Sequence, residues 1–298
     1  MTNSIRNERW LRVQSALWRR PWARAAIALT PPLAWFLLVY VASLVVLLVT
    51  AFWQVNPFTS NIERAWSLGN FQTIFTTPAY LSIIGKTVGM AAAVTVTDAV
   101  VAVPFAYFMA RIAAPRTRTA LFVAILLPLW ASYLAKVYSW LLIFTNNGFL
   151  DWVLGRVGIG KSNLIYTNWA VFVVFCYLWL PYMIIPVYSA FERVPASLIE
   201  ASQDLGGRTW RTTRQVLLPL ALPGIMAGSI FTFSLTLGDY ITPLLVGGTS
   251  ANFMGNVIYT NIGIANNVPF AAAMALVPIV IMGIYLLGAR ALGAFEAI

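Results

Sequence analysis

The chain has 298 residues, of which 60% are hydrophobic and 9% are charged, whereas soluble domains carry roughly 25% charged residues, so an ordinary soluble protein is excluded. The formal net charge is +10, but the cations lie in short segments between apolar runs and do not form a nucleic-acid surface. There is no histidine and only one cysteine, which excludes histidine metal sites, histidine bases and an intrachain disulfide.

A basic segment, 1–24, precedes a single predicted membrane domain, 25–298. Each of six apolar runs is long enough for a helical span, which needs about 20 residues. The first run is too long for the apolar core of a signal peptide. Only helices and closed barrels cross membranes, and these runs are too continuous for barrel strands, so an all-α integral membrane fold is predicted. The six runs are 25–53, 82–110, 119–145, 164–190, 216–246 and 268–292.

The Lys and Arg residues are unevenly divided between the two sides of these spans. The two termini, the second–third loop and the fourth–fifth loop together hold fourteen of the nineteen. The opposite side holds three, namely Arg64, Arg156 and Lys161. Because cytoplasmic loops carry the excess of Lys and Arg, we predict cytoplasmic N- and C-termini and a cytoplasmic fourth–fifth loop.

The second run contains a carboxylate, Asp98. Such a group costs about 2.5–3.5 kcal/mol at the centre of a span on insertion scales, so it usually faces a protein interior or a water-filled path. Asp98 therefore either lines a path or pairs with Lys86 or Lys136. Close helix packing is predicted at two glycine pairs with four-residue spacing, Gly85 with Gly89 and Gly224 with Gly228.

The third–fourth loop matches the phosphate-loop pattern at Gly155, Gly160, Lys161 and Ser162. A phosphate loop needs a strand before it and a helix after it, so that backbone amides converge on phosphate. No parallel-sheet pattern surrounds this match, and the predicted topology places it away from cytoplasmic ATP. We interpret it as accidental.

The fourth run carries Trp179 and Tyr182 on either side of a proline, and aromatic faces at such positions can bind an amine or lie at the membrane interface. The fifth run carries Asp239 between Gly238 and Pro243, which permit a break in the helix. Two interpretations remain for Asp239. In the first, its carboxylate binds a cation on a translocation path. In the second, it is structural, either as an ion-pair partner or as the cap of a broken helix.

A polar segment at about 191–215 separates the fourth and fifth runs. Pro195 suits the first turn of a helix, and Gly206 with Gly207 suits the left-handed turn that ends one. The pattern predicts a helix, a glycine turn and a second helix. This segment is either a docking surface for a soluble partner or an amphipathic helix on anionic lipid. The first helix places Leu198, Ile199, Ser202 and Leu205 on one stripe, and Glu200 and Asp204 on another face.

The sequence EASQDLG, from Glu200 to Gly206, with Leu218-Pro219 after it, resembles the cytoplasmic loop motif of ABC-importer permeases. Ser202 and Val216 differ from the commonest pattern, where Ala and Ile stand. With the six spans, the resemblance covers nearly the whole chain. It implies a coupling helix that docks in a cleft of a separate ATPase. The implied contact residues are Glu200, Ala201, Ser202, Asp204, Leu205, Gly206, Leu218 and Pro219.

Two further stretches are similar to spermidine/putrescine-type permeases: LGDYITPLLVGG, followed by MGN at 254–256, and NNGFLDWVLGRVGI from 146. This resemblance implies a small cationic solute, with a polyamine first. An amino-acid-like solute, an opine or another organic solute remains open. The implied path residues are Asp239, Tyr240, Trp179, Tyr182 and Asp98.

The resemblance also implies that this bacterial inner-membrane subunit is not an enzyme and binds no cofactor or metal itself. ATP and Mg would bind a cytoplasmic ABC ATPase dimer. The other implied partners are a homologous second permease subunit, an extracytoplasmic solute-binding protein and membrane lipid, with no nucleic acid. Two other classes stay open. A stand-alone ion-coupled carrier usually has inverted repeats and more intramembrane charge, and a membrane enzyme would need the phosphate-loop match.

Overall fold

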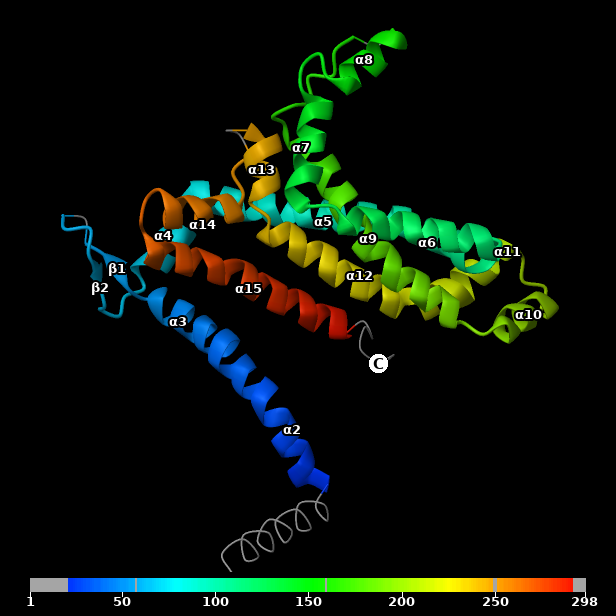
Figure 1. The fold of residues 1–298 in the computed structure, drawn as a ribbon, viewed down its shortest axis with the longest axis horizontal. Helices are drawn as coiled ribbons and strands as arrows, with labels where there is room; N and C mark the ends of the chain where they lie inside the picture. The colour runs from blue at the N-terminus through cyan, green and yellow to red at the C-terminus, as the bar shows by residue number, and fades with distance from the viewer. Residues whose placement is uncertain (1–20, 57, 159, 249–250, 292–298) are drawn as a thin grey trace, which may run out of the picture.

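The structure is a computed structural model that describes residues 21–56, 58–158, 160–248 and 251–291. The basic segment predicted at 1–24 therefore lies almost entirely outside the described residues. The described chain is helical nearly throughout, which confirms the predicted all-α class (Figure 1). The helices are α2 (Pro21–Phe36), α3 (Ala42–Thr50), α4 (Gly69–Thr76), α5 (Pro78–Tyr107), α6 (Pro115–Trp130), α7 (Tyr133–Phe144), α8 (Phe149–Arg156), α9 (Asn168–Arg193), α10 (Ala196–Asp204), α11 (Thr209–Thr212), α12 (Leu218–Gly238), α13 (Ile241–Val246), α14 (Met254–Gly263) and α15 (Val268–Ala291).

Three π-helical segments continue or join these helices, and two short strands follow the first span. The strands β1 and β2 pair antiparallel, with Gln54 opposite Glu63 and Val55 opposite Ile62. They form a small hairpin beside α3 and α4 (Figure 1). The π-helical segments are η1 (Leu37–Val41), η2 (Phe108–Ile112) and η3 (Thr213–Leu217), and the strands are β1 (Gln54–Val55) and β2 (Ile62–Glu63).

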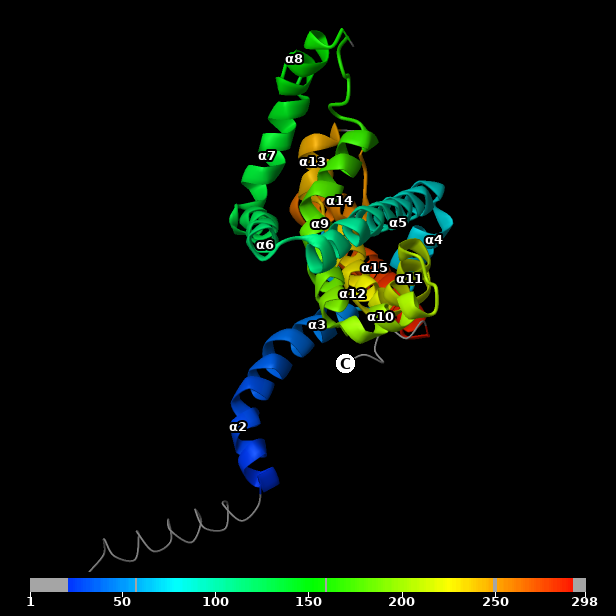
Figure 2. The same ribbon diagram turned by 90° about the vertical axis from the view of Figure 1, so that its right-hand side faces the viewer.

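The centre of the molecule consists of α5, α9 and α12, which pack against one another (Figures 1 and 2). A Cβ placed on Gly224 or Gly228 would lie 2.4 or 2.7 Å from atoms of α9, so the absence of a side chain lets α12 approach α9 closely. The close packing predicted for this glycine pair is confirmed. A Cβ on Gly85 or Gly89 would meet nothing within 4 Å, so the prediction for that pair is wrong within the described chain.

Five helical segments match predicted runs and are long and apolar enough to span a membrane. Helical segments are stable in the lipid bilayer because their backbone N–H and C=O groups form hydrogen bonds within the same segment. Prolines inside them, such as Pro181 and Pro186 in α9, are tolerated where neighbouring helices surround the backbone. The five segments are Ala25–Thr50, Pro78–Ile112, Asn168–Arg193, Trp210–Gly238 and Val268–Ala291.

The third predicted run, 119–145, is a broken pair of helices and not one straight helix. Its two parts, Pro115–Trp130 and Tyr133–Arg156, are bent by 96° relative to each other. The bend arises because Ala131 is extended and Ser132, with a ψ of 135°, is also not helical, so the backbone changes direction between α6 and α7. The structure therefore has six spans only if this bent pair counts as one. Composition alone could not reveal the bend, because both parts are apolar.

The first span extends away from the body of the molecule (Figure 1). None of the hydrophobic window in Ala25–Thr50 is buried, and α3 contacts α15 at the end of this span. Large apolar side chains therefore stay exposed along α2, η1 and α3, including Trp35 and Leu38. In a membrane, lipid or a second chain covers such a surface.

Candidate functional site

The segment between α9 and α12 folds as a helix, a glycine turn and a second helix, as the sequence predicts. Residues Val194 and Pro195 are extended, so the chain leaves α9 and turns into α10. After α10 the backbone of Gly206 takes a φ of +78°, a left-handed angle that side chains other than glycine rarely adopt. The turn leads into α11 and η3, and then into α12.

Hydrogen bonds fix this turn in one geometry. The amide of Gly207 donates to the carbonyl oxygen of Ser202 at 2.8 Å, and the amide of Gly206 donates to that of Gln203 at 2.8 Å. A Cβ on Gly207 would lie 2.6 Å from the same Ser202 oxygen, so the turn leaves no room for a side chain there. The hydroxyl oxygens of Ser202 and Thr212 are 2.9 Å apart. Ser202 thus ties α10 to α11.

The candidate docking residues divide into an exposed group and a structural group. Glu200, Ala201, Asp204 and Gly206 are exposed, and Leu205 is 88% exposed. Leu205 follows directly after the last residue of α10, and its amide still donates to the carbonyl oxygen of Ala201 at 3.2 Å. Ile199 packs partly against the core and Ser202 bonds α11, so these two hold the loop in place. Leu218 and Pro219 are exposed in the first turn of α12.

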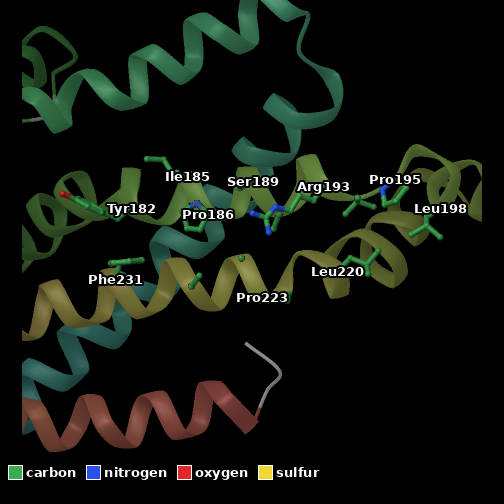
Figure 3. A pocket seen from close by; sticks show the side chains of 14 residues that line it. Tyr182, Ile185, Pro186, Ser189, Arg193, Pro195, Leu198, Leu220, Pro223 and Phe231 are labelled. Carbon is green, nitrogen blue, oxygen red and sulfur yellow. The ribbon is translucent and has the colours of Figure 1, made fainter. Parts of the chain in front are cut away.

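An apolar cavity of about 580 Å³ lies between α9 and α12 (Figure 3). Figure 3 places Tyr182 and Phe231 at one end of this cavity, and Leu198 of α10 at the other. Arg193 lines it near α10. The predicted path residue Tyr182 therefore belongs to a surface that continues down to the polar loop.

At the opposite end of α12, Asp239 occupies a break between α12 and α13. Its Oδ1 accepts hydrogen bonds from the amides of Ile241 and Thr242 at 2.9 and 3.2 Å. Its Oδ2 accepts from the Thr242 hydroxyl at 2.9 Å and from the Tyr133 hydroxyl. The predicted helix break is confirmed, and the carboxylate caps α13 and binds α7 at the same time.

Aromatic side chains line the cavity beside this carboxylate. Tyr133 stacks on Trp179 with ring centroids 6.2 Å apart and 17° between the planes, and Trp179 lies 6.0 Å from the ring of Tyr182. A carboxylate beside aromatic faces can hold an alkylammonium group. A second cavity, of about 320 Å³, opens here and is lined by Tyr133, Trp179, Ser234, Leu235, Gly238, Asp239, Tyr240 and Ile241.

The start of α14 packs against the break between α12 and α13. A Cβ on Gly255 would lie 2.9 Å from the carbonyl oxygen of Asp239, so this close approach requires glycine. The side-chain amide of Asn256 donates to the carbonyl oxygen of Tyr240 at 2.9 Å, and the ring of Tyr240 stacks on that of Tyr259 at 4.7 Å. The two sequence stretches 237–248 and 254–256 therefore form one structural unit.

Asp98 lies apart from this cavity. It is 1% exposed in α5, and its carboxylate lies beside Cys176 of α9. Its Oδ2 has no hydrogen-bond partner within the described structure. The structure therefore places Asp98 between α5 and α9, and does not place it with Asp239 among the residues that line either cavity.

The phosphate-loop match has a geometry unlike that of a phosphate site. Gly155 lies within α8, so a helix and not a strand precedes the loop. The amide and the hydroxyl of Ser162 both donate to Oδ1 of Asp151 at 2.8 Å. A carboxylate of the chain itself thus occupies the donors that a phosphate would need.

A comparison with known families decides the class of protein. The model of the binding-protein-dependent transport system inner membrane component matches residues 102–295. The chain belongs to this family. It is thus the permease subunit of an ABC importer, and an integral multi-pass protein of a bacterial inner membrane.

Two curated relatives of this permease have similar sequences. The inner membrane ABC transporter permease protein YdcU of Escherichia coli is 42% identical over 96% of this chain and 95% of its own length. The spermidine/putrescine transport system permease protein PotB of Haemophilus influenzae is 31% identical over 73% of this chain and 76% of its own length.

Solved structures share the fold of this permease. A bacterial ABC transporter that imports alginate matches with a TM-score of 0.75 and 18% identity, over 94% of this chain and 97% of that chain. The methionine transporter MetNI, in an inward-facing conformation, matches with a TM-score of 0.56 and 20% identity, over 72% and 94% of the two chains. At these identities the likeness concerns the fold alone.

Within the permease, the structure brings together some of the predicted path residues and adds others. Asp239, Tyr240 and Trp179 share a cavity, and Tyr182 lies next to it. Sequence reasoning did not assign Tyr133, although it is an aromatic residue in an apolar run. Its contact with Asp239 depends on the bend between α6 and α7, for which the apolar pattern carries no clear signal.

Proposed function

We propose that this permease forms half of the translocation path for a small cationic solute, with a polyamine as the first candidate. The observation that carries the proposal is the carboxylate of Asp239 at a helix break, facing a cavity among aromatic rings. An ammonium group that loses its hydration inside the membrane needs such partners. The sequence similarity to PotB supports the same solute class.

The test is uptake into proteoliposomes that hold this chain, the second permease subunit and the ATPase, with the binding protein outside. We expect ATP-dependent accumulation of labelled putrescine or spermidine. Accumulation of an amino-acid-like zwitterion instead of these polyamines would contradict the polyamine proposal and leave the permease role intact. Uptake without any ATPase subunit would indicate a stand-alone carrier.

We also propose that α10 is the helix that docks on a separate ABC ATPase dimer. The exposed residues Glu200 and Asp204 of α10, and Leu205 directly after it, support this role because no other part of the described chain covers them. ATP and Mg then bind the ATPase, and this chain holds no cofactor or metal. Glu200→Lys reverses the charge of the docking face and should abolish co-purification of the ATPase.

The remaining proposed partners are a homologous second permease subunit and a solute-binding protein on the outer side. The exposed first span and the cavity between α9 and α12 support a second subunit, because both leave apolar surface uncovered. Lipid covers the rest, and no nucleic acid takes part. A periplasmic binding protein bound to an alginate transporter of the same fold supports the outer partner.

A further inference from the structure

Two arginines join three helix ends at the end of the bundle that carries α10. Arg111, in η2, donates from Nη2 to the carbonyl oxygens of Phe191 and Val194 at the end of α9. Arg118, in α6, donates to the carbonyl oxygens of Met109 and Ala110 at 3.0 and 3.1 Å. The ends of α5, α6 and α9 are therefore linked by side chain to backbone contacts.

The contacts of Arg111 have a physical basis in the helix end. The last carbonyl groups of a helix have no partner within the helix, and they form the negative end of its dipole. A guanidinium group has several fixed donors and can bind two such carbonyls at once. Phe191 and Val194 are buried, so the contact is shielded from solvent by the surrounding apolar cluster.

Val194 connects the contact of Arg111 to α10. Val194 is followed by Pro195, and α10 begins at the next residue. A displacement of α10 must therefore move the backbone that Arg111 holds. The ring of Phe191 also lies 5.9 Å from that of Tyr107 at the end of α5, so apolar contact accompanies the hydrogen bonds.

We propose that Arg111 is a positioning residue that transmits movement of α10 to α5. The inference rests on the proposed function, in which α10 receives the ATPase. The connection from α10 to α12 runs through Ser202, Thr212 and η3. Arg111 supplies the corresponding polar connection from α10 to α5. Closure of the ATPase then moves both of the long helices that pack on α9.

The test compares Arg111→Gln with Arg116→Gln in the complete transporter in proteoliposomes. Arg116 is a matched control, because it is an exposed arginine in the first turn of α6. The measured quantities are co-purification of the ATPase, melting temperature, ATP hydrolysis stimulated by the loaded binding protein, and solute transported per ATP. We expect Arg111→Gln to assemble normally and to transport about tenfold less solute per ATP, within the range of known coupling free energies.

Arg111→Lys serves as the conservative variant and decides the result if Arg111→Gln fails to assemble. One ammonium group replaces the two-carbonyl contact only in part, so an intermediate ratio supports the proposal. The proposal is overturned if an assembled Arg111 variant transports the normal amount of solute per ATP hydrolysed. It is also overturned if transport is lost only to the extent that assembly with the ATPase is lost. Absence of stimulated hydrolysis in the wild-type complex would instead refute the proposed function.

Discussion

At the scale of single residues, Asp239 has two roles that different substitutions separate. Asn and Asp cap helices almost equally well, whereas Ala at such a position costs about 0.5–2 kcal/mol. The asparagine side chain in Asp239→Asn can keep accepting from the amides of Ile241 and Thr242 while it carries no charge. We expect Asp239→Asn to lower uptake of a dicationic solute strongly, with little change in melting temperature.

The companion variant Asp239→Ala removes both the charge and the cap. It should lose uptake and also melt at a lower temperature in detergent, because the amides at the start of α13 lose their acceptor. Transport at the wild-type rate by Asp239→Asn would show that the charge has no role in the path. Binding of solute to the separate receptor protein is the control for both variants and should not change.

Gly255 allows a second prediction at this scale. Because a Cβ there would lie 2.9 Å from a backbone oxygen of Asp239, Gly255→Ala must push α14 away from the helix break. Overpacking of this kind costs roughly 1–3 kcal/mol. Gly263 in the same helix has open space around it, so Gly263→Ala is the control. Thermal unfolding in detergent should show a lower melting temperature for Gly255→Ala only, and equal melting temperatures would contradict the close approach.

At the scale of elements, the turn after α10 should depend on conformation at Gly206 and on space at Gly207. Nothing lies within 4 Å of a Cβ on Gly206, but its φ of +78° strains most side chains. Gly206→Val should weaken ATPase co-purification and uptake, since a left-handed residue other than glycine costs about 1–2 kcal/mol. Asn tolerates this angle, so Gly206→Asn should preserve the turn.

These two variants also distinguish a turn residue from a contact residue. If Gly206→Asn keeps the melting temperature but still loses the ATPase, the glycine itself lies in the contact with the partner. If Gly206→Val behaves as the wild type in co-purification and uptake, the left-handed turn is not needed for docking.

The elements that local sequence chemistry determines could be predicted, and those that depend on contacts between distant segments could not. Pro195 and the two glycines indicated the helix and turn at α10, and Gly238 with Pro243 indicated the break before α13. The bend at Ala131 lies within one apolar run, and the contact of Tyr133 with Asp239 joins residues that are 106 positions apart. Hydrophobic periodicity carries no information about such pairings.

At the scale of the whole molecule, the Lys and Arg distribution predicts which face of the membrane each loop occupies. We expect Lys161→Cys, in a Cys176→Ala background, to react with an impermeant thiol reagent in intact spheroplasts, because this loop position is exposed and predicted to lie outside. Gln203→Cys, exposed on α10, should react only after lysis. The reverse labelling pattern would overturn the predicted orientation.

The four hydrogen bonds on the Asp239 carboxylate bear on how fast a solute can pass. Because these donors already satisfy the group, each contact that an ammonium makes must displace or share an existing one, and the net gain is small. Weak retention favours throughput, since a conducting site must bind a solute strongly enough to admit it and weakly enough to release it. Selection between solutes would then occur before the solute reaches the membrane. The cavity beside α13 would determine the rate of transport more than the solute specificity.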